Sequence, residues 1–158
     1  MTAFEGLGME TSHADTNSRE GFYAGNVAGA IALIVEDDSN NAYALSALLT
    51  RGSMTVVRAE SGPDALDILT QRDDIGIVLM DIMMPVMDGY ETMTTMRKRI
   101  QSAELPIIAV TGKADDGERE RCIAAGASAY IPKPVDTAAL LNAISHCLPA
   151  PTPDAPRP

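Results

Sequence analysis

The sequence has little cysteine. Its two cysteines, Cys122 and Cys147, both fall in segments with helical periodicity and do not have the spacing of metal ligands. Disulfide-stapled scaffolds and cysteine-based zinc sites need more cysteines or closely spaced pairs, so both classes are excluded. We therefore expect two reduced thiols that take part in the packing of a cytosolic protein.

Basic residues are also scarce. Twelve Lys and Arg stand against 22 Asp and Glu, which gives a net charge of -10. Residues 30–148 alone contain ten basic and seventeen acidic residues, a net charge of -7. Binding to nucleic acid requires a basic face that neutralises phosphates, so direct nucleic-acid binding is excluded.

Long apolar runs are absent as well. No run approaches the roughly 20 apolar residues that a membrane-spanning helix needs. The N-terminus lacks the basic-then-apolar order of a signal peptide. We therefore expect no contact with a membrane and a cytoplasmic location.

The chain of 158 residues, 46% of them hydrophobic, is long enough for one domain with a real core. Residues 1–29 mix Gly, Ser, Thr, Asn and acids without periodicity, and residues 149–158 are rich in proline. Such segments do not bury enough apolar surface to fold alone, so we expect two flexible extensions. A single domain is expected over residues 30–148.

Within that domain, strand-like and helix-like patterns alternate five times. Runs of branched apolar residues predict buried strands near residues 31–35, 54–58, 75–80, 107–111 and 129–131. Gly89 leads into one helical segment, and polar residues that can cap a helix precede the other four: Asp38 or Ser39, Ser61, Asp115 or Asp116, and Asp136. Right-handed crossovers then favour a doubly wound α/β fold with helices on both faces of a parallel sheet.

Three acidic residues follow directly on two of these apolar runs. Glu36 and Asp37 come after residues 31–35, and Asp81 comes after residues 75–80. In an open α/β sheet the carboxyl ends of the strands form the edge where ligands bind. Three neighbouring carboxylates repel one another, and a hard divalent cation with oxygen ligands is the remedy we expect.

Four motifs at the strand ends carry a family resemblance. They are Ile34-Val-Glu-Asp-Asp38, Leu79-Met-Asp-Ile-Met-Met-Pro-Val-Met-Asp-Gly89, Ala109-Val-Thr-Gly112 and Tyr130-Ile-Pro-Lys-Pro-Val135. In this order the chain resembles the receiver domain of two-component response regulators over residues 30–148. The resemblance implies a (βα)5 flavodoxin-like fold with strand order 2-1-3-4-5, and transfer of a phosphoryl group from a phosphohistidine to one aspartate.

The resemblance also assigns the acidic residues. It implies that Asp81 is the phosphorylated residue, which agrees with the ability of a carboxylate to attack phosphorus and form an acyl phosphate. Asp37 would bind Mg²⁺ directly, and Glu36 would bind it directly or through a water. Asp81 itself and the backbone carbonyl of Met83 would complete the protein ligands.

The other motifs supply the remaining expected roles. By resemblance, Lys133 reaches a phosphate oxygen from the end of the fifth strand, and Thr111 donates its hydroxyl to another. Tyr130 matches the aromatic residue that turns inward when the threonine moves, so Thr111 and Tyr130 form the expected switch. The bond that joins Lys133 to Pro134 is expected to be cis.

The expected partners follow from the same resemblance. The phosphoryl donor would be a sensor histidine kinase or a histidine phosphotransfer protein. Residues 113–122 and 130–148 would form the surface that changes on phosphorylation, with partner docking or a phosphate-dependent homodimer there. We expect a complete small regulator or the receiver segment of a hybrid sensor kinase, and the alternative is an adaptor that binds its partner independently of phosphate.

Two residues are expected to govern the lifetime of the phosphate. Met83 and Lys113 lie two positions beyond Asp81 and Thr111, where side chains flank the approach of the hydrolytic water. A thioether does not orient water, and a charged lysine offers only hydrogen-bond donors. We therefore expect slow self-dephosphorylation.

Overall fold

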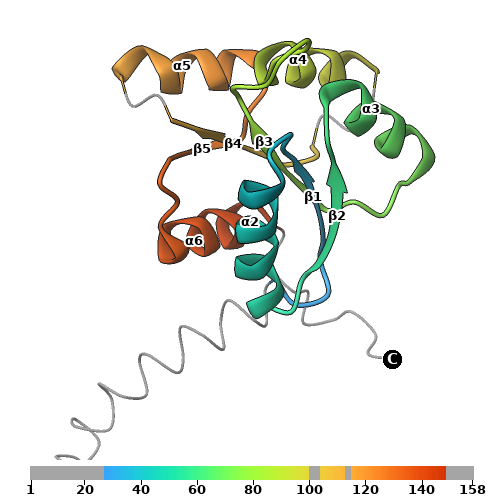
Figure 1. Cartoon of the computed structure of the whole chain (residues 1–158), viewed down its shortest axis with the longest axis vertical. Helices are drawn as coiled ribbons and strands as arrows, with labels where there is room; N and C mark the ends of the chain where they lie inside the picture. The colour runs from blue at the N-terminus through green and yellow to red at the C-terminus, as the bar shows by residue number, and fades with distance from the viewer. Residues whose placement is uncertain (1–26, 100–103, 113–114, 149–158) are drawn as a thin grey trace, which may run out of the picture.

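The fold is a five-stranded parallel sheet with helices on both faces (Figure 1). The computed structural model describes residues 27–99, 104–112 and 115–148. The strand order β2-β1-β3-β4-β5 is the order expected from the sequence. In chain order the elements are β1 (Ile31–Val35), α2 (Ser39–Arg51), β2 (Thr55–Ala59), α3 (Gly62–Gln71), β3 (Ile77–Asp81), α4 (Gly89–Arg99), β4 (Ile107–Thr111), α5 (Asp116–Ala125), β5 (Ala129–Pro132) and α6 (Thr137–Cys147).

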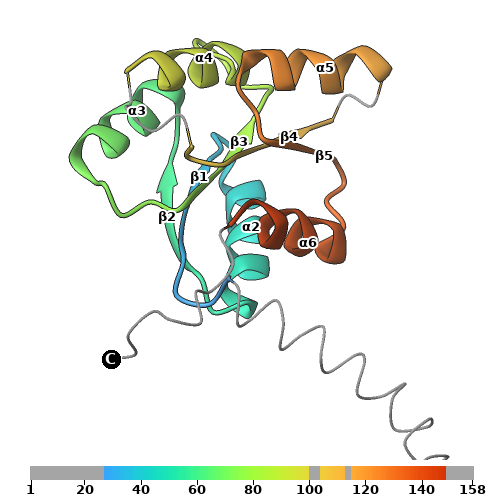
Figure 2. The ribbon, with the colours of Figure 1, turned by 180° about the vertical axis from the view of Figure 1, so that it is seen from behind.

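The apolar strands are buried on both faces. Leu33 and Val35 of β1 belong to a core cluster with α3, α4 and α5, whereas Ala32 and Ile34 belong to a second cluster with α2 and α6. This alternation is the two-residue period of a strand, with both of its faces covered. Figures 1 and 2 show the two helical layers on opposite sides of the sheet.

Three strands differ by one or two residues from the sequence expectation, and one of them, β5, ends at Pro132 and not at residue 131. β3 begins at Ile77 and not at residue 75, because pairing with β1 starts at Ala32 opposite Ile77. Asp81 is itself the last residue of β3 and pairs in register with Val110. β2 begins one residue late, because the N–H of Met54 donates to the carbonyl of Leu49 and closes the end of α2.

The helix starts agree with the sequence. Each cap side chain accepts a hydrogen bond from the backbone N–H three residues later, which satisfies one of the unpaired donors of the first turn. Asp88 does the same for the N–H of Glu91 at the start of α4. The four predicted caps that the structure confirms are Asp38, Ser61, Asp115 and Asp136.

Arg97 joins the ends of α4 and α5. Its guanidinium donates to the carbonyl of Gly126 from Nε at 3.1 Å and from Nη2 at 2.7 Å, and Nη1 donates to the carbonyl of Leu105 at 2.7 Å. Gly126 has a φ of 122°, and a Cβ there would lie 2.9 Å from Arg97. Only glycine fits this backbone conformation without strain.

Some expectations lie outside the described residues. Residues 1–26 and 149–158, which hold nearly all of the two predicted extensions, are among them, and so is Lys113. Cys122 and Cys147 lie in α5 and α6 as free thiols. Across the part of the chain that the structure describes, no helix combines the length and the apolar character needed to span a membrane.

Candidate functional site

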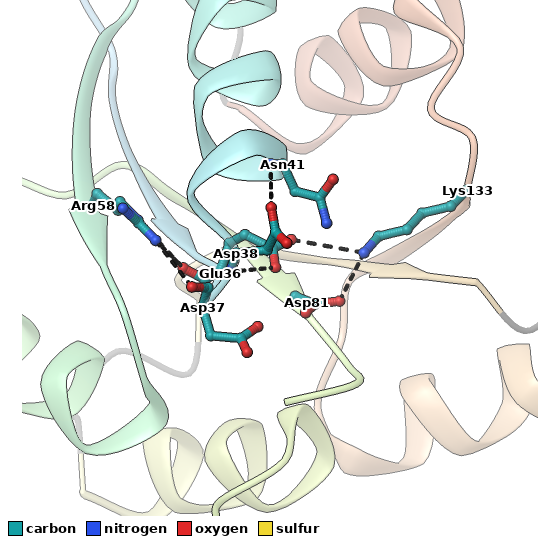
Figure 3. Close-up of polar contacts among 7 residues, drawn as sticks. All are labelled: Glu36, Asp37, Asp38, Asn41, Arg58, Asp81 and Lys133. Carbon is teal, nitrogen blue, oxygen red and sulfur yellow. Dashed lines mark hydrogen bonds and ion pairs between the residues drawn. The ribbon is translucent and has the colours of Figure 1, made fainter. Parts of the chain in front are cut away.

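Three carboxylates meet at the carboxyl edge of the sheet. β1 and β3 are hydrogen-bonded neighbours, so Glu36 and Asp37, which follow β1, lie beside Asp81 at the end of β3 (Figure 3). One oxygen from each of the three residues lies within 4.8 Å of the others. Glu36 and Asp81 are buried, at 1% and 4% exposure, whereas Asp37 is exposed. The cluster is therefore open to solvent on the side of Asp37.

The charges in this cluster are poorly compensated. Burial, together with the negative charge of Asp81, raises the pKa of Glu36 to about 7. Within the described residues, Oε1 of Glu36 has no hydrogen-bond partner. A buried polar atom without a partner is costly and calls for a ligand. Together with the carboxylates of Asp37 and Asp81, Glu36 forms the donor set of a hard divalent cation, so these residues fit a Mg²⁺ ion.

Lys133 approaches the same cluster from the loop after β5. Its Nζ donates to Oδ1 of Asp81 at 3.1 Å and lies 3.7 Å from Oε1 of Glu36 (Figure 3). Burial alone would lower the pKa of Lys133, but the hydrogen bond to Asp81 and the charges of both acids raise it overall. The ammonium therefore stays charged next to Asp81.

Arg58 contacts the main chain behind the acids, and sequence reasoning missed this contact. The guanidinium donates to the carbonyl of Glu36 from Nη2 at 3.0 Å and from Nε at 3.3 Å, and to the carbonyl of Asp37 from Nη2 at 3.3 Å. A signal was present, because Arg58 is the one charged residue of β2 and lies near its carboxyl end. Its target could not be read without the pairing of β1 with β2.

Comparison with known proteins identifies the family. The family model for the response regulator receiver domain matches residues 32–145, which include the acidic cluster and all the strands except the first residue of β1. This chain is a member of the response regulator receiver family. Receiver domains accept phosphoryl groups in two-component signalling, and they generally bind Mg²⁺ at an acidic pocket like this cluster.

Relatives of this receiver occur both alone and within larger proteins. The chain is 34% identical to the protein PilH of Pseudomonas aeruginosa over 116 residues, which is 73% of this chain and 95% of PilH. It is 31% identical to hybrid signal transduction histidine kinase I of Dictyostelium discoideum over 119 residues, which is 72% of this chain but only 7% of that kinase. The crystallised chemotaxis protein CheY4 of Vibrio cholerae has a TM-score of 0.71 and 26% identity, with 77% of this chain and all of that chain covered.

The expected switch residues of the receiver lie on β4 and β5. Thr111 is fully buried at the end of β4, one position beyond Val110, which pairs with Asp81, and its carbonyl accepts from the N–H of Lys133 at 2.7 Å. Tyr130 is half-buried and packs against the core cluster that includes α5. Burial, with the nearby charges of Glu118 and Asp115, raises the pKa of the Tyr130 hydroxyl.

The loop that follows Asp81 is held close to the receiver site. The N–H of Gly89 donates to the carbonyl of Ile82 at 3.0 Å, and a Cβ at Gly89 would lie 2.7 Å from the carbonyl oxygen of Asp81. Glycine thus lets α4 begin directly against the end of β3. Met83 lies in this loop and is 58% exposed. The bond between Lys133 and Pro134 is cis, as expected.

Proposed function

We propose that Asp81 is the phosphorylated residue of this receiver. A carboxylate oxygen of Asp81 attacks the phosphorus of a phosphohistidine, the P–N bond breaks, and the imidazole leaves with the electron pair. The donor is a sensor histidine kinase or a histidine phosphotransfer protein. The observation that carries this proposal is the Asp81 carboxylate, buried among two further acids yet within 3.1 Å of the Lys133 ammonium.

We assign the metal site to the same residues. Asp37, Asp81 and the carbonyl of Met83 would hold Mg²⁺, with Glu36 as a direct or water-mediated ligand. The bound ion would supply positive charge against the charge that builds on the transferring group. Lys133 binds a phosphate oxygen with the ammonium that now contacts Asp81, so phosphorylation exchanges one anionic partner of the lysine for another.

An apolar groove beside the site fits the approach of the donor. A cavity of about 470 Å³ opens between α2 and the loop after β5, with Glu36 and Lys133 at one end. Its walls are largely aliphatic: Ala44, Leu45, Leu48, Val110, Pro134 and Val135. We assign this groove to an amphipathic helix of the phosphodonor, because an apolar helix face buries well there while a histidine on it faces Asp81.

The output of the receiver passes through a second surface. Thr111 donates its hydroxyl to the phosphate, and Tyr130 moves inward on β5. Both changes act on the surface made by α5, β5 and α6, where we place phosphate-dependent partner docking or homodimer formation. The functional unit is the receiver domain of residues 30–148. The similarity to a hybrid kinase favours a second context, in which this receiver works as a segment of such a kinase.

The proposal is tested by labelling with acetyl phosphate and Mg²⁺. Asp81→Asn should abolish the hydroxylamine-sensitive label, because the acyl phosphate forms on this residue alone. Asp88→Asn is the matched control, since it changes a neighbouring aspartate whose cap an asparagine also makes. Persistent label in Asp81→Asn would refute the assignment.

The switch is tested by hydrogen exchange with and without beryllofluoride, a mimic of the phosphoryl group. Altered exchange in α5, β5 and α6 is expected. An unchanged profile there, together with equal partner affinity in both states, would instead support the adaptor that binds independently of phosphate.

A further inference from the structure

We propose that Arg58 is a positioning residue for the metal site, a role that rests on the proposed function. Arg58 does not contact the carboxylate oxygens that would bind the ion. It holds the main chain that carries them. The inference concerns how one exposed ligand, Asp37, keeps a fixed orientation in a loop.

The contacts of Arg58 span the whole connection between β1 and α2. Besides the carbonyls of Glu36 and Asp37, its Nη1 lies 3.5 Å from Oγ of Ser39, the first residue of α2. The N–H of Glu36 also donates to the carbonyl of Ala59 at 3.0 Å, so β2 holds this loop by its main chain and by the Arg58 side chain. The fork of a guanidinium suits several acceptors at once, which an ammonium does not match.

The side chains of the loop residues Glu36 and Asp38 also accept hydrogen bonds within this segment, whereas that of Asp37 does not. The N–H of Asp38 donates to Oε2 of Glu36 at 3.2 Å, and Oδ1 of Asp38 accepts from the N–H of Asn41 at 3.0 Å. Among the described residues, nothing donates to the carboxylate of Asp37. The direction of that carboxylate is therefore set by its main chain, and Figure 3 shows the contacts of Arg58 ending on this main chain.

Geometry and charge predict opposite effects when Arg58 is removed. The guanidinium is a cation near an anionic site, so its removal by charge alone would strengthen the binding of a divalent cation. Loss of the hydrogen bonds would release the loop, misplace Asp37 and weaken that binding. Groups that orient metal ligands typically contribute tenfold or more to affinity, so we expect geometry to outweigh the charge of Arg58, which is half-buried and still partly screened by solvent and salt.

The test is the binding of Mg²⁺ alone, measured by titration calorimetry on the full chain. Arg58→Gln should weaken binding about tenfold. Arg58→Lys, which keeps the charge but loses the fork, should weaken it to a similar extent. Arg72→Gln is the matched control, because Arg72 pairs with Asp74 in an exposed contact far from the site, and its affinity should equal that of the unmutated chain.

Two further readouts separate positioning from a general loss of stability. In EDTA, hydrogen exchange should rise at the amides of Glu36, Asp37 and Asp38 in Arg58→Gln, while the β3 and β4 amides keep their protection. Titrations are run well below the unfolding midpoint of each variant. If Arg58→Gln does not fold, the affinity of Arg58→Lys for Mg²⁺ is the test of the positioning role.

The outcomes distinguish this inference from the proposed function. Equal or tighter Mg²⁺ binding in Arg58→Gln would overturn the positioning role, and so would full affinity in Arg58→Lys. Absence of Mg²⁺ binding in the unmutated chain would instead refute the metal site of the proposed function.

Discussion

Two buried glutamates in this molecule have opposite surroundings. Glu36, in the acidic cluster, and Glu118, on α5, are each only 1% exposed. Glu36 lies beside Asp81 and leaves one oxygen without a hydrogen bond. Glu118 lies between α4 and α5, and both of its oxygens have partners, Tyr90 and Cys122.

The surroundings of Glu118 form a closed set of contacts. The hydroxyl of Tyr90 donates to Oε1 of Glu118, and Sγ of Cys122 lies 3.8 Å from Oε2. Arg121 covers the ring of Tyr90 at 4.4 Å and brings a positive charge to the same place. Burial, with the charge of Glu118, raises the pKa of Cys122 to about 11, so this thiol stays protonated and unreactive.

The difference teaches how to read a buried acid. A carboxylate whose oxygens are all paired within the fold contributes to stability and needs nothing further. A carboxylate that faces like charges with an unpaired oxygen destabilises the fold until an external cation binds. Burial alone therefore does not identify a functional acid, whereas its partners do.

The largest expected difference is in phosphorylation. Asp37→Ala should lower the rate of labelling by acetyl phosphate roughly 100-fold, because it removes the exposed carboxylate that we propose as a ligand of the metal. Glu118→Gln should change the rate less than twofold, since Glu118 lies outside the acidic cluster. Radiolabel incorporation over time measures both rates. A comparable loss of rate in both variants would show that the two regions are not independent.

For the stability of the fold, in contrast to the rate of phosphorylation, substitution of Glu118 should have a clear effect. Glu118→Ala should lower the free energy of unfolding by about 2 kcal/mol, because it removes packing and leaves the Tyr90 hydroxyl without its acceptor. Urea denaturation in EDTA measures the change. Glu120→Ala, an exposed site on the same helix, is the control and should have little effect. A loss below the control value would mean that Glu118 is not a structural acid.

The pH dependence of stability should come from Glu36. Its folded pKa of about 7 exceeds the ordinary value of 4.5, so the folded protein binds the proton more tightly. This stabilisation is complete below pH 4.5 and is lost as the pH rises through 7. We expect a loss of about 1–2 kcal/mol, reduced from the ideal value because water reaches the mouth of the cluster.

Unfolding midpoints in EDTA between pH 4.5 and 8 test this dependence. Glu36→Gln should flatten the curve, and Mg²⁺ should restore stability to the unmutated chain at pH 8, because the ion favours the charged acids. A curve of unchanged slope in Glu36→Gln would assign the titration to another group.

The smallest expected effect concerns the rate at which the phosphate is lost. Met83→Asn combined with Lys113→Glu should speed loss of the phosphate several-fold, because an amide and a carboxylate orient water where a thioether and an ammonium do not. The decay of radiolabel after removal of the donor measures it. An equal or slower decay would show that these two positions do not control access of water.

The fold was largely predictable, because its signals are local. Apolar runs gave the strands, and single cap residues such as Asp38 and Asp136 gave the helix starts. The start of β3 was misplaced, since Ile75 is as apolar as the strand itself and only the pairing with β1 excludes it. A local signal does not carry information about the partner strand.

The candidate site was predictable only in part. Glu36, Asp37 and Asp81 could be placed together, because strand ends meet at one edge of a parallel sheet, and the family resemblance added Lys133. Arg58 could not be matched to Glu36, nor Glu118 to Tyr90, because these partners lie 22 and 28 residues away in the chain. The register of β1 against β2 sets the first contact, and the packing of α4 against α5 sets the second.

The link between α4 and α5 has a mechanical consequence. Tyr90 joins the first turn of α4 to the first turn of α5 through Glu118, and Arg97 joins their last turns through Gly126. Two helices that are joined at both ends resist rotation about one end and sliding along each other. Displacement of the start of α5 is then expected to move α4 as part of the same rigid body, so that motion begun at one edge of the sheet also reaches α4.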